Sequence, residues 1–209
     1  NKGTTEYLTP KVSVRLNPGN NMKDHSADTK IITADNVFDI NRLGISDSYE
    51  AGKSITLGSD YKFDLIEKDT KQNLDIKDRF LEFKLATVLR DKVENNIPTS
   101  STIDRKNSNL FGSINNNLFE NINFGYDFSI DNDLESFDSQ SFNTEISVNN
   151  FLTTFDFIEQ NSKLGETHVL SNTTQYKIDE NNFIKFSTRR NKTINLTEYY
   201  NLSYEYKND

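Results

Sequence analysis

The sequence has no cysteine and no tryptophan, and it holds only three prolines and one methionine among 209 residues. The lack of cysteine excludes a disulfide framework and a thiolate metal site within these residues. No apolar run approaches the roughly 18 residues that a membrane-spanning helix requires, so helical spanning is excluded. Only 33% of the residues are hydrophobic, which is low for the core of an ordinary soluble domain. A packed globule is therefore not the simplest interpretation.

Signs of catalysis and of nucleic-acid binding are also lacking. The net charge is −8 and no basic run is present, which argues against a nucleic-acid partner. His25 and His168 lie in polar stretches without a credible serine partner, and the G-x-S-x-G elbow is absent. Residues 28–39 lack the D-x-D-x-D-G order of a calcium loop. We therefore expect a protein that is not an enzyme, with no catalytic, metal-binding or cofactor-binding residues.

Aromatic residues are plentiful, and they are dispersed among polar ones. The 15 Phe and 9 Tyr do not gather into apolar blocks, which favours strands over helices. In residues 121–131, and again in 55–65 and 200–206, apolar side chains occupy one parity and small or polar side chains the other, with Ser59 as one interruption. We predict that the apolar parity faces lipid, and the residues assigned to it are Ile55, Leu57, Tyr61, Phe63, Ile122, Phe124, Tyr126, Phe128, Tyr200, Leu202, Tyr204 and Tyr206.

The links between about ten expected strands alternate in length. Those expected to be short are 117–120, 149–150 and 179–182, and those expected to be long are 17–52, 92–107, 132–140 and 160–168. The link 67–78 is on the side of the short turns but is not short. The loop at Thr193 is on the side of the long loops but is rather short. Short turns on one side and long polar loops on the other are typical of an outer-membrane barrel. The predicted fold class is therefore all-β, an antiparallel up-and-down transmembrane β-barrel, here a partial barrel forming an open curved sheet.

Three features allow a second interpretation. Residues 79–90 could form a helix with one apolar face, although the neighbouring strands favour a strand. The tyrosines in 199–206 fit a barrel's aromatic girdle or a sugar-stacking platform. Arg189 and Arg190 fit charges at headgroup level or a contact with lipid or sugar phosphates. Another outer-membrane barrel, such as a porin or receptor, and a soluble carbohydrate-binding β-sandwich therefore remain alternatives.

Several segments resemble a known family. Residues 8–11 (LTPK), 17–24 (NPGNNMKD), 35–44 (DNVFDINRLG) and 47–52 (DSYEAG) are similar to the barrel domain of LptD, the LPS-assembly outer-membrane protein family also called OstA or organic solvent tolerance protein. Residues 83–101, 123–131 and 196–209 are similar to its alphaproteobacterial-type members, which favours a strand for 79–90. The family-motif loop consists of Asn17, Pro18, Gly19, Asn41, Arg42, Gly44, Asp47, Glu50 and Gly52.

The resemblance implies transport without covalent chemistry. It implies that lipopolysaccharide is handed up from a periplasmic bridge protein and passes through the barrel into the outer leaflet of the Gram-negative outer membrane. The implied partners are lipopolysaccharide, a plug lipoprotein in the barrel lumen, the bridge protein and membrane lipids. Residues 1–209 are then expected to be a partial barrel domain, without the N-terminal periplasmic domain, the first strands and the closing strands.

Overall fold

Ten long strands make up most of the chain in this computed structural model, which describes residues 2–19, 21–68, 75–162 and 165–207. The strands are β1 (Lys2–Asn17), β2 (Gly52–Lys68), β3 (Asp75–Arg90), β4 (Leu110–Phe119), β5 (Ile122–Ile130), β6 (Phe137–Val148), β7 (Phe151–Ser162), β8 (Gly165–Lys177), β9 (Asn182–Asn191) and β10 (Leu196–Tyr206). One short 3-10 helix, η1 (Thr99–Ser101), interrupts the link between β3 and β4. No helix in the described part of the chain is long and apolar enough to cross a membrane.

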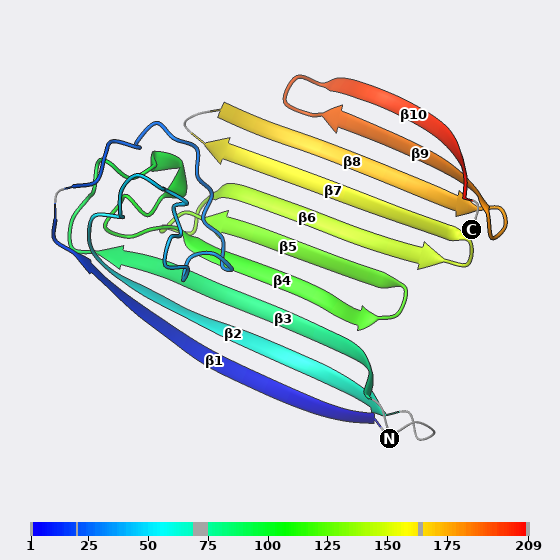
Figure 1. The fold of residues 1–209 in the computed structure, drawn as a ribbon, viewed down its shortest axis with the longest axis horizontal. Helices are drawn as coiled ribbons and strands as arrows, with labels where there is room; N and C mark the ends of the chain where they lie inside the picture. Colours follow the sequence, from blue (N-terminus) through cyan, green and yellow to red (C-terminus); the bar gives the residue numbers. More distant parts are fainter. Residues whose placement is uncertain (1, 20, 69–74, 163–164, 208–209) are drawn as a thin grey trace.

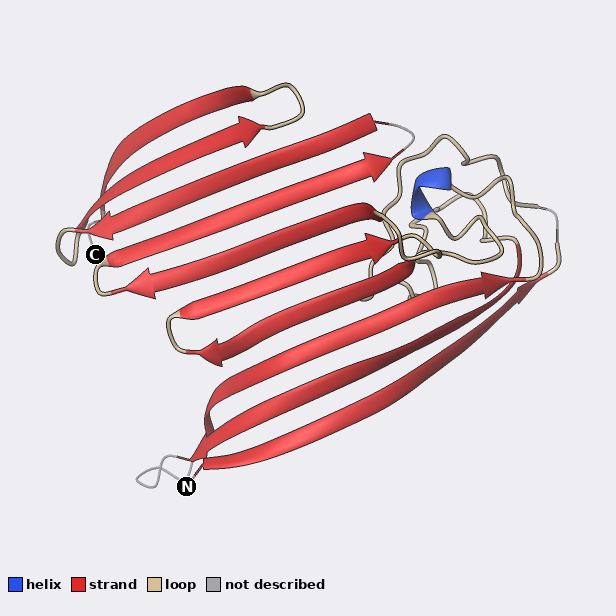
Figure 2. Cartoon of the chain, turned by 180° about the vertical axis from the view of Figure 1, so that it is seen from behind, coloured by secondary structure: helices blue, strands red, loops and turns tan. Residues whose placement is uncertain are grey.

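All ten strands form one antiparallel sheet in the order in which they occur along the chain (Figure 1). Each strand is hydrogen-bonded to its sequence neighbours, and β1 and β10 lie at the two edges. Figure 2 shows the same open, curved sheet from behind, with the irregular segments gathered at one end. The prediction of about ten strands in an up-and-down antiparallel order is confirmed, and residues 79–90 belong to a strand and not to a helix.

The links agree with the predicted alternation at most positions. The two longest described links, 18–51 and 91–109, lie on the side predicted to carry loops, and 149–150 is a tight turn as predicted. The prediction of a long link at 160–168 is wrong, because β7 continues to Ser162 and β8 begins at Gly165. The link at 132–140 is also shorter than predicted, since β6 begins at Phe137. Of the predicted link 67–78, residues 69–74 lie outside the described residues, and the remaining residues belong to β2 and β3.

The strand register places the apolar parity on one face of the sheet. One continuous row of paired positions runs across β1 to β8 through Leu8, Tyr61, Phe83, Ile114, Tyr126, Phe142, Phe157 and Leu170. A second row links β5 to β10 through Ile122, Ile146, Thr153, Thr174, Phe186 and Leu202. All twelve residues predicted to face lipid share this face, which we call the outer face. Their contact with lipid remains a prediction.

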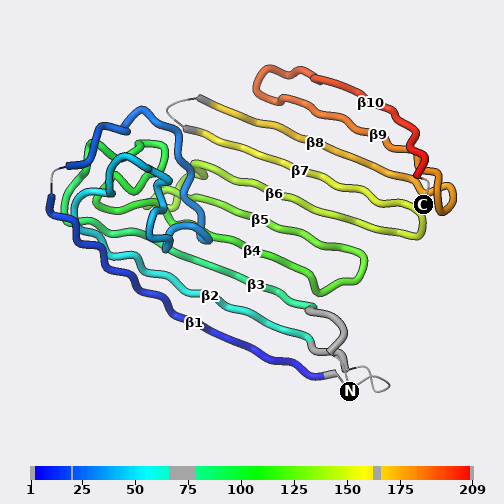
Figure 3. Tube along the Cα trace, in the orientation of Figure 1, coloured from blue at the N-terminus to red at the C-terminus, as the bar shows by residue number. Residues whose placement is uncertain are grey.

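The opposite face, here called the inner face, carries a small hydrophobic core. The links 18–51 and 91–109 fold back over the ends of β2, β3 and β4 (Figure 3) and form what we call the loop cluster. Its apolar side chains and those of the sheet beneath it form one buried set: Met22, Ile32, Ala34, Val37, Leu43, Ala51, Ala86, Val88, Ile97, Ile103 and Phe111. The sequence predicted a polar loop at 17–52, whereas the structure shows a packed one.

A glycine on the outer face makes room for an aromatic ring. Gly112 of β4 is paired with Phe128 of β5, and the Phe128 ring lies where a Cβ atom on Gly112 would be. The ring therefore covers the glycine backbone and contacts Tyr126, whose ring centroid is 5.6 Å away. This arrangement lets a residue with weak intrinsic strand preference lie inside a long strand.

We predict that Gly112→Val disrupts the pairing of β4 with β5. A branched side chain collides with the Phe128 ring, and overpacking of this kind typically costs about 1–3 kcal/mol. The urea midpoint of the refolded protein should fall, and Gly112→Val combined with Phe128→Ala should recover part of the loss. An equal midpoint for Gly112→Val and the unchanged protein would contradict this packing.

Candidate functional site

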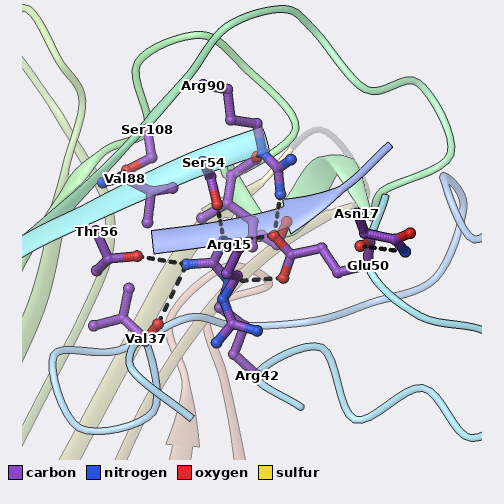
Figure 4. A network of polar contacts seen from close by, with 12 residues as sticks. Arg15, Asn17, Val37, Arg42, Glu50, Ser54, Thr56, Val88, Arg90 and Ser108 are labelled. Carbon is purple, nitrogen blue, oxygen red and sulfur yellow. Dashed lines mark hydrogen bonds and ion pairs between the residues drawn. The ribbon is translucent and has the colours of Figure 1, made fainter. Parts of the chain in front are cut away.

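The loop cluster is held to the sheet by a buried arginine from the family-motif loop. Arg42 is 1% exposed, and its Nε donates to Glu50 Oε2 at 2.8 Å. Its Nη1 donates to the Thr56 hydroxyl of β2 at 2.9 Å, and its Nη2 donates to the Ser54 hydroxyl at 3.2 Å. The small hydroxyl residues on the inner face of β2 thus serve as acceptors for a guanidinium that comes from the loop (Figure 4). A planar, five-donor group suits this multiple recognition better than lysine would.

A second arginine reaches the same carboxylate from the end of β3. Arg90 donates to Glu50 Oε1, and its Nη1 donates to the backbone oxygen of Ala51 at 2.9 Å. Its Nε donates to the backbone oxygen of Ile103, in the other segment of the loop cluster. Arg90 therefore connects the link 18–51, the strand β3 and the link 91–109 through one side chain.

Glu50 is the shared acceptor of this network, and it is charged. Burial alone raises the pKa of a carboxyl, but the hydrogen bond from Arg42 and the charges of Arg42, Arg90 and Arg15 together lower the pKa of Glu50 below its ordinary value. Arg15 lies on β1, and its Nη1 donates to the backbone oxygen of Ile40 at 2.6 Å. The carboxylate is thus surrounded by cationic groups from two strands and the loop.

The other family-motif residues shape the same loop. Asn17 donates to the backbone oxygen of Glu50 at 3.1 Å, and Asn41 both donates to and accepts from the backbone of Ile45. Gly44 and Gly52 have φ values of 68° and 85°, where a side chain would be strained. The structure brings all nine motif residues into the loop cluster and its junctions with β1 and β2: Asn17, Pro18, Gly19, Asn41, Arg42, Gly44, Asp47, Glu50 and Gly52.

Asp47, also from the motif, takes part in a second polar contact at the surface of the cluster. His25 Nδ1 is 2.7 Å from Asp28 Oδ2, and its Nε2 is 3.0 Å from Asp47 Oδ1. The hydrogen bond with Asp28, followed by that with Asp47, raises the pKa of His25. Lys23 Nζ lies 3.0 Å from Asp47 Oδ2, and its hydrogen bond is the largest cause that lowers the pKa of Asp47. These contacts connect the first and last parts of the link 18–51.

An aromatic residue of the loop packs on the inner face. The Phe38 ring sits against Gly58 of β2, where an added Cβ would lie 2.9 Å from Phe38 Cζ and 2.7 Å from the backbone oxygen of Leu85. Lys11 Nζ of β1 is 5.6 Å from the centroid of the same ring. The loop therefore packs on residues within the strands, and not only at their ends.

A cavity of about 160 Å³ lies between the loop cluster and the inner face of β4 to β7. Ile31, Ile32 and Phe111 supply its apolar lining, and Arg105 and Asp138 supply charges. No group of three or more His, Asp or Glu side chains in the described part of the chain is placed to hold a metal ion. The site is thus a packed polar junction on the face of a sheet, and its chemistry is charge pairing and hydrogen bonding.

Sequence reasoning did not identify the partners of the motif. Arg90 closes a segment whose helix or strand identity was ambiguous, and Arg15 lies in a weakly patterned strand. The apolar residues that recur at irregular spacing within the link 18–51, and the isolated Ile97 and Ile103, were the signal that these links are packed. An apolar residue recurring inside a long polar link indicates a core that the link itself helps to form.

We predict that Arg42→Met releases the loop cluster. Removing one partner of a buried ion pair leaves Glu50 short of a partner and typically costs about 3–5 kcal/mol. Protease cleavage within residues 18–51 should therefore become much faster. Arg105→Met is the matched control, because the Arg105 side chain belongs to the same cluster and is 37% exposed. Equal cleavage of the two variants would contradict the role given to Arg42.

We predict a loss of loop protection in acid that depends on Glu50. The pKa of Glu50 is lowered in the folded state, so its contribution to stability is present above the ordinary value of 4.5 and is lost as the pH falls through the folded pKa. Hydrogen exchange of the link 18–51 should rise below about pH 4.5. Glu50→Gln should show higher exchange at pH 7 and a flatter dependence in acid. Parallel profiles for the two proteins would assign the acid sensitivity to another group.

Comparison with known proteins identifies the family. Residues 1–169 match the family LptD, LPS transport system D. No curated protein matches the chain. The matched region contains the whole loop cluster, the Arg42–Glu50–Arg90 network and strands β1 to β7. LptD is a family of lipopolysaccharide transport and assembly at the outer membrane and not a family of enzymes. A match over most of the chain shows that this protein belongs to the LptD family.

Proposed function

We propose that this chain forms part of the wall of an outer-membrane β-barrel that passes lipopolysaccharide into the outer leaflet. The observation that carries the proposal is the division of one sheet into an apolar outer face and a polar inner face. Many outer-face side chains are exposed, among them Leu8, Val12, Tyr200 and Leu202. An apolar face of this extent requires a cover, and in a barrel the cover is lipid.

A soluble sandwich would cover the same face with a second sheet. The described strands all belong to a single sheet, and the loop cluster packs on its other face. A membrane wall therefore accounts for the apolar face better than a carbohydrate-binding sandwich does. Membership of the LptD family favours lipopolysaccharide as the cargo over the solutes of a porin.

The inner face suits a cargo that carries phosphorylated sugars. Below the loop cluster it presents charged side chains, including Lys11, Asp60, Lys84 and Glu82. Lys84 Nζ lies 2.8 Å from Asp35 Oδ1 of the loop, so this charged surface continues onto the loop cluster. In the proposed arrangement the inner face borders the lumen, where the plug lipoprotein is held. The bridge protein delivers lipopolysaccharide from the periplasmic side.

The two edge strands, β1 and β10, each have a neighbouring strand on one side only in the described residues. In the described residues β1 pairs only with β2, and β10 pairs only with β9. Unpaired backbone groups are not tolerated in the hydrocarbon region. We propose that additional strands of the complete protein close the barrel, that a periplasmic domain accompanies it, and that residues 1–209 form one continuous part of its wall.

The lipid-facing assignment predicts that a charge on the outer face blocks membrane insertion. Phe124→Lys should impair insertion, because a lysine on the lipid face costs up to about 2–4 kcal/mol, most at the bilayer midplane. Asn123→Lys is the matched control, because it adds the same charge to the adjacent inner-face position of β5. Folding into vesicles is measured by the heat-dependent mobility of the folded barrel in gel electrophoresis. Normal insertion of Phe124→Lys would contradict a lipid-facing outer face.

The transport role is tested in cells depleted of the full-length protein. Newly labelled lipopolysaccharide should no longer reach the cell surface after depletion, and the unchanged gene should restore its arrival. The Asn123→Lys variant should restore it as well, whereas Phe124→Lys should not. Undiminished arrival in depleted cells would overturn the proposed function while leaving the barrel fold intact.

A further inference from the structure

Three basic side chains gather on the outer face where β8 and β9 approach the loop side of the sheet. Arg190 is paired across the sheet with Leu170, which is paired with Phe157, so all three lie on the outer face. Lys192 follows the end of β9, and its Nζ lies 5.7 Å from the centroid of the Phe157 ring. His168 of β8 is paired with Glu159 on the same face. We call Arg190, Lys192 and His168 the outer basic patch.

Amide and carboxylate groups surround this patch. The His168 Nε2 atom lies 3.0 Å from Asn161 Oδ1 and 3.5 Å from Glu159 Oε1. Glu159 Oε2 also accepts a hydrogen bond from the Gln140 amide at 2.6 Å. Arg190 Nη2 donates to Asn195 Oδ1 at 2.6 Å. The carboxylate of Glu159 is thus engaged by its own neighbours, while Arg190 and Lys192 have exposed side chains.

The patch differs from the rest of the outer face on the loop side. The corresponding ends of β1 to β6 present mostly apolar residues there, among them Leu16, Ile55, Leu89, Ile130 and Phe137, with Lys53 of β2 as a basic exception. Basic groups are therefore not a general feature of the strand ends. Figure 1 places the turn between β9 and β10 at the same end of the sheet as the loop cluster. Glu166 is the other outer-face acid nearby, two residue pairs closer to the loop side than His168.

We propose that the outer basic patch binds the phosphorylated sugar headgroup of a lipopolysaccharide molecule in the outer leaflet. The inference rests on the proposed function, which places lipid against the outer face, and on the general arrangement of outer-membrane barrels, whose longer loops lie on the outer-leaflet side. It adds a binding site on the outside of the wall, separate from the passage along the inner face.

Charge and shape both support this occupant. Arg190 and Lys192 supply charge-assisted hydrogen bonds to a phosphate. Asn161 and Asn195 supply amide groups of the kind that bond sugar hydroxyls. Phe157 and Leu170 lie beside Arg190 in one row across the sheet and supply apolar surface for acyl chains. A headgroup that combines phosphate and sugar uses both the cations and the amides, whereas a phospholipid without a sugar makes little use of the amides.

The test compares neighbouring arginines on opposite faces of β9. The full-length protein is placed in nanodiscs that contain a neutral phospholipid and a small fraction of lipopolysaccharide, and the lipid retained after detergent extraction is counted by native mass spectrometry. The double variant Arg190→Gln and Lys192→Gln should retain about tenfold less lipopolysaccharide, because each lost charge-assisted bond weakens binding. Arg189→Gln should retain as much as the unchanged protein, because Arg189 lies on the inner face and contacts Glu198.

Several outcomes would overturn the proposal. Equal retention by the double variant and the unchanged protein would remove the patch as a site, and so would an equal loss in Arg189→Gln. If phosphatidylglycerol is retained as strongly as lipopolysaccharide through the same residues, the patch recognises any anionic lipid and not a phosphorylated sugar. Folding is verified for each variant by its heat-dependent mobility. Surface delivery of labelled lipopolysaccharide is measured separately, so a failure of the proposed transport function is distinguished from a failure of this site.

Discussion

The carboxylate of Glu50 determines where the loop cluster lies. It accepts hydrogen bonds from Arg42, which comes from the same link, and from Arg90 of β3, and both arginines then bind groups elsewhere in the cluster or the sheet. A buried charge without partners is costly, so the three side chains stabilise only one arrangement of these segments. The hydrophobic core around Val37, Ile97 and Phe111 fills the space that this arrangement leaves.

The two faces of the sheet place different demands on the same strands. On the outer face, large apolar side chains meet across neighbouring strands, as in the row through Tyr61, Phe83 and Ile114. On the inner face of β2, small hydroxyl residues are required because Arg42 and the loop must approach the backbone closely. Gly58 shows the same demand, since Phe38 occupies the space above it. The alternation of residue types along each strand therefore produces one apolar face and one face on which the loop cluster packs.

The fold could be predicted from the sequence because strand alternation is local. Residues 121–131 and 200–206 carry it without interruption, and the structure has strands there. The candidate site could be predicted only in part. The motif containing Arg42 and Glu50 is visible as a segment, but its partners Arg15 and Arg90 lie on strands that are distant in sequence. Periodicity gives no information about such contacts, and for the same reason the packing of the link 18–51 was not foreseen.

The loop cluster also constrains the order in which the molecule assembles. Neighbouring strands are joined by short turns at 120–121, 149–150 and 178–181, so these hairpins close over small separations along the chain. The loop cluster instead joins residues far apart, as in the hydrogen bond from Asn96 to the backbone of Met22, which spans 74 positions. Contacts of such long range form slowly, because a large loop must close first. The long-range contacts of the cluster are therefore expected to form late in folding, after the neighbouring strands β1, β2 and β3 have paired.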